Sequence, residues 1–365
     1  MTTYRVIVPL LVLVGSALRL LAQVPAGDLG PVRTRSPLTE EDRTAVRAFI
    51  DQRVAQVVGQ DPAATQAAAQ ALRTNYAGSD DFKKTYAAMC IEAFNAAMNQ
   101  AEVAPAARLL TILNTFSVAE AQPLFSDALQ DARAGVRAAA AAGLRTLRPT
   151  TAQAGAQPYA SALNALKEAA KKEKSRDALR TMYAAMDYSD VPRAPDLKTD
   201  VSAVLEVLEE RAKPYAARQD VPGLGADDAG LAVGEKLLKT MSPEERKRLT
   251  VVVGTMVRYA VEQFTADPQR FTTLHDATGS RLVIEQRNSL ERLVLVGEKL
   301  LATLLTPKTA PGVMDAMRKL DTKAMRLQWK DWATLLQATV NQDFTLAEPA
   351  EGETGESAGG GPGVP

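Results

Sequence analysis

The residue types that most often carry out catalysis are scarce in this sequence of 365 residues. His275 is the single histidine and Cys90 is the single cysteine. General acid–base and nucleophilic sites combine such groups, so neither residue on its own predicts a catalytic centre. Cys90 lies in the apolar stretch YAAMCIEAF, which indicates a small buried side chain. Zinc sites need three or four ligands of these types, and we predict no metal site of that kind.

Carboxylates gather in the stretch DYSDVPRAPDLKTD, which supplies Asp187, Asp190, Asp196 and Asp200. Such a group could surround a calcium ion, but the alternating ligands and central glycine of an EF-hand loop are absent. We favour a structural interpretation, in which these aspartates cap a helix that runs from Leu197 to about Lys213 and is interrupted by Pro214.

Both tryptophans occur in the stretch RLQWKDWATLLQ. Met325, Trp329 and Trp332 recur at helical spacing and therefore share one helix face. One interpretation is a closing helix that completes a core. The other is an anchor patch for a protein partner, because tryptophan is enriched where interfaces concentrate their binding energy.

Other patterns typical of enzymes are missing. The GLG at Gly223 lacks the lysine and the preceding strand of a phosphate-binding loop, and no nucleophile elbow occurs. We therefore predict no catalytic residues and no cofactor, and we expect a protein that is not an enzyme. An enzyme of an unfamiliar type is the remaining alternative.

Charge gives no sign of a nucleic-acid partner. Forty-three basic residues balance 43 acidic ones, so no global field draws the chain to nucleic acid or to an anionic membrane. The densest basic run, LKEAAKKEKSR at residues 166–176, is interpreted as a solvated helix face. A surface for an acidic partner is the alternative.

The N-terminal residues 1–22 resemble a secretory signal peptide. Arg5 precedes an apolar run from Val6 to Leu18, which is shorter than the roughly 20 residues of a membrane-spanning helix. We expect cleavage after Ala22 or Ala26, a linker over residues 23–38, and a periplasmic or secreted protein. The alternatives are an uncleaved membrane anchor over residues 6–22 and a buried helix.

Residues 345–365 form an acidic tail rich in Gly, which predicts disorder.

Between Thr39 and Phe344 the apolar spacing is helical and no strand-like alternation is found, so we predict an all-α protein. Helix starts are marked by capping signals at Thr39 with Asp42, Asp61 with Pro62, Ser117 with Glu120, and Ser242 with Glu245.

Two-helix units begin at intervals of about 40 residues, near Thr39, Asp81, Val118, Gln157 and Leu197. The second helix of the third unit, DARAGVRAAAAAGLRTLRP, contains a Val136-Arg137 pair, then alanines, then Leu144. This pattern resembles a HEAT or armadillo repeat over residues 39–217, most clearly at 118–148. The resemblance implies stacked antiparallel helical hairpins, an α-solenoid, in which alanine permits close packing. A compact helical bundle is the alternative.

The stretch RQDVPGLGADDAG, residues 218–230, combines three glycines with a proline and predicts a linker between two regions. Residues 231–344 form a region of longer helices richer in Leu and Val. The same stretch VGEKLL occurs twice there, at Val233 and at Val296. We interpret it structurally, as helices that pack through Gly234 and Gly297.

Together these features predict an exported, non-enzymatic helical-repeat scaffold or adaptor that binds protein partners. The alternative is a domain that binds a small apolar or lipid-like ligand between the helices from Leu249 to Leu305.

Overall fold

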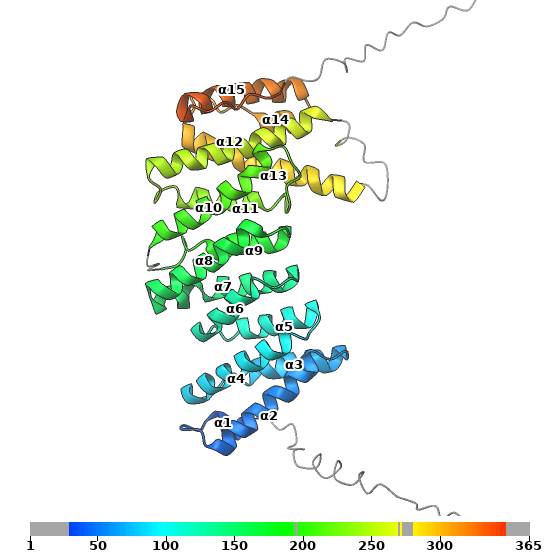
Figure 1. Cartoon of the computed structure of the whole chain (residues 1–365), viewed down its shortest axis with the longest axis vertical. Helices are drawn as coiled ribbons and strands as arrows, with labels where there is room; N and C mark the ends of the chain where they lie inside the picture. Colours follow the sequence, from blue (N-terminus) through cyan, green and yellow to red (C-terminus); the bar gives the residue numbers. More distant parts are fainter. Residues whose placement is uncertain (1–28, 193, 195, 269–270, 272–279, 348–365) are drawn as a thin grey trace, which may run out of the picture. The chain divides into compact units, whose positions relative to one another are not determined.

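A computed structural model describes residues 29–192, 194, 196–268, 271 and 280–347. Every regular element among these residues is a helix, which confirms the all-α prediction (Figure 1). The predicted signal peptide over residues 1–22, both cleavage positions at Ala22 and Ala26, His275 and the tail from residue 348 lie outside the described residues.

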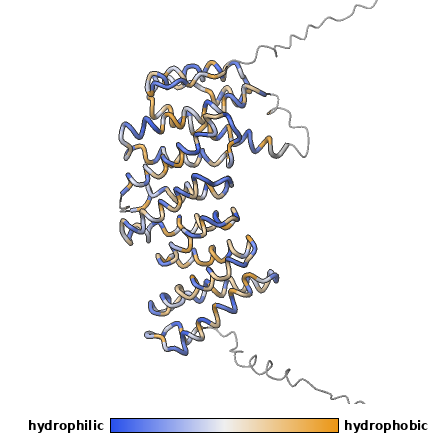
Figure 2. Tube along the Cα trace, in the orientation of Figure 1, coloured by the Kyte–Doolittle hydropathy of each residue, from blue (hydrophilic) through white to orange (hydrophobic). Residues whose placement is uncertain are grey.

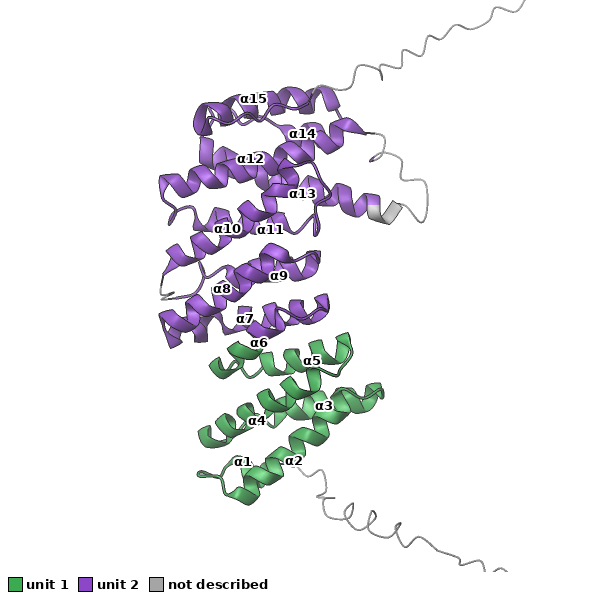
Figure 3. Cartoon of the chain, viewed as in Figure 1, with its two compact units in different colours: residues 1–124 green, residues 125–365 purple. Residues whose placement is uncertain are grey.

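The chain divides into two compact units, residues 1–124 and residues 125–365 (Figure 3). The predicted linker at residues 218–230 lies inside the second unit, and the last part of it belongs to a helix that begins at Asp227. A glycine-rich loop marks a boundary only when few contacts cross it. This loop is instead held by hydrogen bonds, among them one from Arg211 Nη2 to the Pro222 carbonyl oxygen at 2.6 Å.

The first unit contains α1 (Gly30–Arg33), α2 (Glu40–Val57), α3 (Pro62–Thr74), α4 (Asp80–Met98), α5 (Val103–Asn114) and the 3-10 turn η2 (Ala119–Ala121). Helix α6 (Gln122–Ala128) crosses the division between the units. Within the first unit α2 packs on α3 and α4 packs on α5, while α2 also contacts α4 and α3 contacts α5.

The predicted linker over residues 23–38 is partly wrong, because its described end is packed against the start of α4. The Ser79 amide donates to the Arg33 carbonyl oxygen at 2.7 Å, and the Leu38 amide donates to Asp81 Oδ2 at 2.9 Å. Leu38 is also buried. Residues 29–38 therefore belong to the first unit.

Capping chemistry explains where several helices begin. Both predicted capping boxes at Thr39 and Ser242 are present, and Asp61 caps α3 as predicted. The predicted box at Ser117 is wrong, because Ser117 adopts a left-handed φ of 53° and its hydroxyl lies 3.5 Å from the Asn114 carbonyl oxygen. The Ser117 side chain therefore does not satisfy the amides of the following turn.

Aromatic packing fills the centre of the first unit. Tyr76 stacks on Phe116 with ring centroids 4.4 Å apart, and Tyr86 contacts Phe116 edge-on. The Tyr86 hydroxyl donates to the Leu72 carbonyl oxygen at 2.9 Å, which satisfies its buried polar group. Cys90 is buried in the same unit, as predicted.

The second unit contains α7 (Ala134–Ala154), α8 (Ala156–Lys172), α9 (Arg176–Met186), α10 (Leu197–Ala216), α11 (Asp227–Leu237), α12 (Pro243–Ala266), α13 (Ser280–Leu305), α14 (Val313–Arg318) and α15 (Thr322–Val340). Their contacts define two rows. In the odd row α7 contacts α9, α9 contacts α11, and α11 contacts α13. In the even row α8 contacts α10, α10 contacts α12, and α12 contacts α15. Contacts between α7 and α8, α10 and α11, and α12 and α13 join the rows.

Apolar and polar residues mix along nearly every helix, as expected of helices that bury one face (Figure 2). In α7, Val136, Ala140, Leu144 and Leu147 form one buried stripe. Gly143 meets the ring of Phe125 so closely that an added Cβ would lie 2.3 Å from Phe125 Cε1. The small residues of α7 therefore allow close packing, as the sequence predicts.

The prediction that Pro214 interrupts its helix is wrong. Helix α10 continues through Pro214 to Ala216, and α7 continues through Pro149 to Ala154. The first VGEKLL stretch closes α11, with Leu238 as the C-cap residue, and the second lies in α13; the two helices contact each other in the odd row. A Cβ on Gly297 would lie 2.3 Å from Val257 Cγ2, so this glycine packs directly against α12.

Candidate functional site

The predicted partner patch at Met325, Trp329 and Trp332 is wrong as a surface, because all three side chains are fully buried within the second unit. Trp329 Nε1 donates to the Phe344 carbonyl oxygen at 2.8 Å, and Trp332 Nε1 donates to Glu298 Oε1 at 2.9 Å. Both indole groups are thus satisfied inside the protein. These residues close the core against α12 and α13, which is the other interpretation that their spacing allows.

Glu298 connects this core to the start of α14. Its carboxylate accepts from the Val313 and Met314 amides at 2.8 and 2.7 Å, in addition to Trp332 Nε1. Burial raises the pKa of Glu298, although these three donors act in the opposite direction. Glu298 is therefore a structural acceptor that satisfies the first-turn amides of a short helix.

The four aspartates at residues 187–200 have separate partners and do not point at a common metal position. Asp187 accepts from Lys236 Nζ at 2.6 Å, and Asp190 pairs with Arg148 Nη1 at 2.9 Å. Asp196 caps α10 as predicted. No group of acidic, cysteine or histidine residues in the described part of the chain has the arrangement of a metal site.

Asp200 differs from the other three because it is fully buried in the first turn of α10. Asp200 Oδ1 forms a hydrogen bond with the Tyr159 hydroxyl from α8. The same hydroxyl oxygen lies 2.9 Å from the Asp196 carbonyl oxygen. Among the described residues, Asp200 Oδ2 and the Tyr188 hydroxyl have no hydrogen-bond partner.

We name Asp200, Tyr159, Tyr188 and Arg148 the Asp200 cluster. The Tyr159 and Tyr188 rings meet edge-on with centroids 4.8 Å apart, and the Arg148 guanidinium lies 5.8 Å from the Tyr188 ring centroid. Burial raises the pKa of Asp200 to about 7, and the charges of Asp187 and Asp196 act in the same direction. Buried carboxyl groups with such a pKa are typical of functional sites.

A second buried polar group is fully satisfied and therefore structural. Asp227 Oδ1 accepts from Tyr183 at 3.0 Å and from Arg211 Nε at 2.5 Å, while Oδ2 accepts from Tyr215 at 2.8 Å and from Arg211 Nη2 at 2.9 Å. This group joins α9, α10 and α11. No polar atom of its carboxylate is left for a ligand, in contrast to the Asp200 cluster.

Ion pairs connect helices of the same row at the surface of the second unit. In the even row, Lys171 pairs with Glu206 at 3.0 Å and Arg248 pairs with Glu209 at 2.7 Å. Most basic side chains of the run at residues 166–176 are therefore engaged within the chain. In the odd row, Arg180 pairs with Asp228 at 2.5 Å.

One helix face in the odd row combines exposed apolar and charged side chains. We name it the α13 face, and it consists of Ile284, Asn288, Arg292, Leu295 and Lys299, all of them exposed. Leu295 is 48% exposed and Ile284 is 38% exposed. They lie about three helical turns apart and therefore share one face. Lys299 pairs with Glu235 of α11 at 2.9 Å, so this ion pair connects the α13 face to α11.

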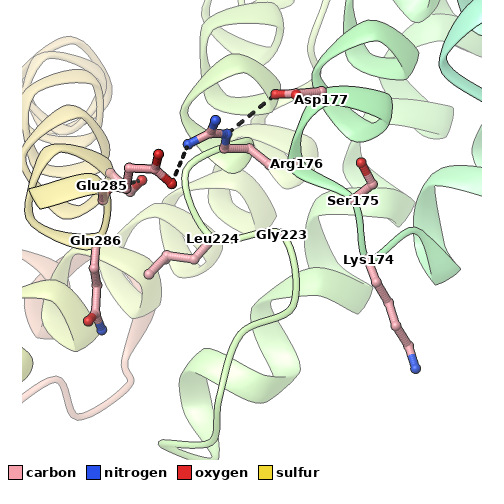
Figure 4. A pocket seen from close by; sticks show the side chains of 9 residues that line it. Lys174, Ser175, Arg176, Asp177, Gly223, Leu224, Glu285 and Gln286 are labelled. Carbon is pink, nitrogen blue, oxygen red and sulfur yellow. Dashed lines mark hydrogen bonds and ion pairs between the residues drawn. The ribbon is translucent and has the colours of Figure 1, made fainter. Parts of the chain in front are cut away.

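A shallow groove of about 360 Å³ lies beside the N-terminal half of α13. It is lined by the start of α9, by the loop at Gly223 and Leu224, and by Glu285, Gln286 and Ser289. Figure 4 shows Arg176 between Asp177 and Glu285, to which it is paired at 3.4 and 3.9 Å. The groove is lined by two basic residues, Lys174 and Arg176, and two acidic ones, Asp177 and Glu285. These charges balance, so the groove has no strong electrostatic attraction for a charged ligand.

The predicted apolar ligand site between Leu249 and Leu305 gains no support from the packing there. Leu249, Val253 and Leu301 are fully buried, and Gly297 packs tightly against Val257.

No helix of the described residues has the length and apolar content that crossing a membrane requires.

Comparison with known proteins gives no further guide: no protein-family model matches the chain, and no curated protein matches it significantly.

Sequence reasoning missed the Asp200 cluster, since Tyr159 and Asp200 are 41 residues apart and meet only through tertiary packing. A tyrosine and an aspartate near the starts of two consecutive predicted two-helix repeats were the only available signal.

Proposed function

We propose that this protein is an exported, non-enzymatic helical-repeat scaffold or adaptor that binds protein partners in the cell envelope or outside the cell. Its helices would form hairpins of the HEAT or armadillo kind. Stacked hairpins present extended surfaces to partners without any catalytic group.

The observation that carries this proposal is the two-row contact pattern of the second unit. Each helix from α7 to α11 contacts the helix two positions further along the chain, so that α7 contacts α9 and α8 contacts α10. Hairpins stacked in register produce this pattern, because equivalent helices of successive units become neighbours. The first unit repeats it between α2 and α4 and between α3 and α5.

Arg137 provides a second line of support. It belongs to the Val-Arg pair of the HEAT-like pattern, and its Nε and Nη2 atoms donate to Glu173 at 2.6 and 2.7 Å. Glu173 in turn accepts from the Lys174 and Ser175 amides in the turn between α8 and α9. Arg137 therefore joins α7 to the turn that connects α8 and α9, which is a contact between successive hairpins.

The α13 face is the partner surface that we favour. Interfaces combine an apolar centre with a polar rim, and Leu295 has Arg292 and Lys299 as exposed neighbours on its face. Leu327 of α15 is also exposed, at 61%. It lies on a different helix and offers a matched control for the surface.

Export rests on the sequence of residues 1–22 alone. The experiment cross-links intact cells, recovers this protein by a C-terminal tag, sequences its N-terminus and identifies attached proteins by mass spectrometry. The proposal expects a mature N-terminus after Ala22 or Ala26 and a small set of envelope or secreted partners. Recovery of the protein alone, with Met1 retained in the cytoplasmic fraction, would contradict it.

A further inference from the structure

Within the Asp200 cluster, the Tyr159 hydroxyl has one proton for two hydrogen bonds. The Tyr159 hydroxyl oxygen lies within hydrogen-bonding distance of Asp200 Oδ1 and of the Asp196 carbonyl oxygen. A phenol supplies a single proton, and a main-chain carbonyl oxygen can only accept. If Asp200 were ionised, two acceptors would therefore compete for the same proton.

A proton on Asp200 resolves this competition. The protonated carboxyl group donates from Oδ1 to the Tyr159 oxygen, and the Tyr159 hydroxyl then donates to the Asp196 carbonyl oxygen. The resulting chain joins α8 to the N-cap residue and the first turn of α10. Every hydrogen bond in it then has its own proton.

We propose that Asp200 is a proton-operated latch: it carries a proton in the folded protein, and loss of this proton loosens the attachment of the α10 N-terminus to α8. This property goes beyond the scaffold function, and it does not depend on any partner.

The surrounding charges give an ionised Asp200 little compensation. From α7, Arg148 is the nearby cation, but it pairs with Asp190 at 2.9 Å. From α11, Lys236 pairs with Asp187. The other charged neighbours are Asp187 and Asp196, whose negative charges disfavour a further one on Asp200. The Tyr188 hydroxyl is neutral, and the negative charge of an ionised Asp200 would raise its pKa.

The remaining carboxyl oxygen points to the same conclusion. Asp200 Oδ2 is buried and has no donor among the described residues. A buried carboxylate oxygen without a donor is far more costly than the oxygen of a neutral acid. Burial raises the pKa of Asp200 to about 7, even though Tyr159 and Arg148 lower it. The latch would therefore release within the physiological range of pH.

Hydrogen exchange of the amides at residues 197–201 tests the proposal on the full-length protein between pH 5 and pH 8. Opening exposes Asp200 to water, where its pKa returns to the usual value near 4. The opening constant should therefore rise about tenfold per pH unit up to about pH 7, beyond the intrinsic dependence of exchange, and then level off. An opening constant that is independent of pH in the wild-type protein would overturn the proposal.

Two substitutions separate the latch from other causes. Asp200→Asn keeps a donor in place of the protonated acid, so its opening constant should not depend on pH. Asp196→Asn keeps the N-cap and the carbonyl oxygen, and should retain the pH dependence. If Asp200→Asn opened with the same pH dependence as the wild type, Asp200 would not be the group responsible.

Infrared spectroscopy observes the proton directly. The difference spectrum between the wild type and Asp200→Asn at pH 5.5 should contain the band of one protonated carboxylic acid, and this band should disappear above pH 8. A carboxylate band in its place at pH 5.5 would overturn the proposal.

Discussion

Tyr159 and Asp200 form a buried hydrogen bond that joins α8 to the first turn of α10. Both side chains are almost completely inaccessible to water, and no basic side chain is hydrogen-bonded to this carboxyl group among the described residues. Asp200 is thus an acidic group of the second unit for which the folded state favours the proton.

Asp200→Asn should therefore change how stability depends on pH. The pKa of Asp200 is raised in the folded state, to about 7 from a usual value of 3.8, so folding takes up a proton between these two values. The wild type should lose stability relative to the variant as the pH rises from 4 to 7, with no further loss above 7. Urea denaturation at pH 4, 5.5, 7 and 8.5 measures this difference. A constant difference across the series would contradict the assignment.

Arg211→Ala should destabilise the protein strongly because it leaves the Asp227 carboxylate buried without its cation. Breaking one side of such a pair costs about 3 to 5 kcal/mol. Arg248→Ala is the control, since its pair with Glu209 is partly exposed and is worth at most about 1 kcal/mol. Urea denaturation of both variants at pH 7 makes the comparison. Equal losses would show that the Asp227 group is not structural.

The repeated VGEKLL stretch supplies a matched pair of glycines. A Cβ at Gly297 would lie 2.3 Å from Val257 Cγ2, whereas a Cβ at Gly234 would meet Leu249 Cδ1 at an ordinary 3.4 Å. Gly297→Ala should cost about 1 to 3 kcal/mol through overpacking. Gly234→Ala should be neutral or stabilise the helix by up to about 1 kcal/mol. Thermal denaturation of the two variants tests this order, and the reverse order would contradict the packing of α13 on α12.

Tryptophan fluorescence tests the position of the only two tryptophans, Trp329 and Trp332. Both are buried and hydrogen-bonded, so acrylamide should quench their emission several-fold less in the folded protein than in urea. Quenching as efficient as that of the unfolded chain would place them at the surface and restore the partner-patch interpretation.

Local patterns predicted the helices well but predicted tertiary relationships poorly. The caps at Thr39, Asp61 and Ser242 depend on neighbouring residues, and all three are present. The box at Ser117 fails because the chain adopts a left-handed conformation there, which the spacing of Ser117 and Glu120 does not reveal.

Burial of aromatic and acidic side chains could not be predicted from spacing. The stripe at Met325, Trp329 and Trp332 suits a core or a partner surface, and only the position of α12 and α13 decides between them. Similarly, the four aspartates suggested caps or a calcium site. Only the structure shows that one of them, Asp200, is buried beside Tyr159 of α8 and Tyr188 of its own stretch.

The most direct test of the scaffold proposal is the binding of the partner identified by cross-linking to purified Leu295→Asp and Leu327→Asp variants. Both side chains are exposed, so neither substitution should impair folding. A charge in the apolar centre of an interface costs affinity, so Leu295→Asp should weaken binding at least about tenfold while Leu327→Asp stays within about twofold of the wild type. Unchanged binding by Leu295→Asp would contradict a partner surface on the α13 face.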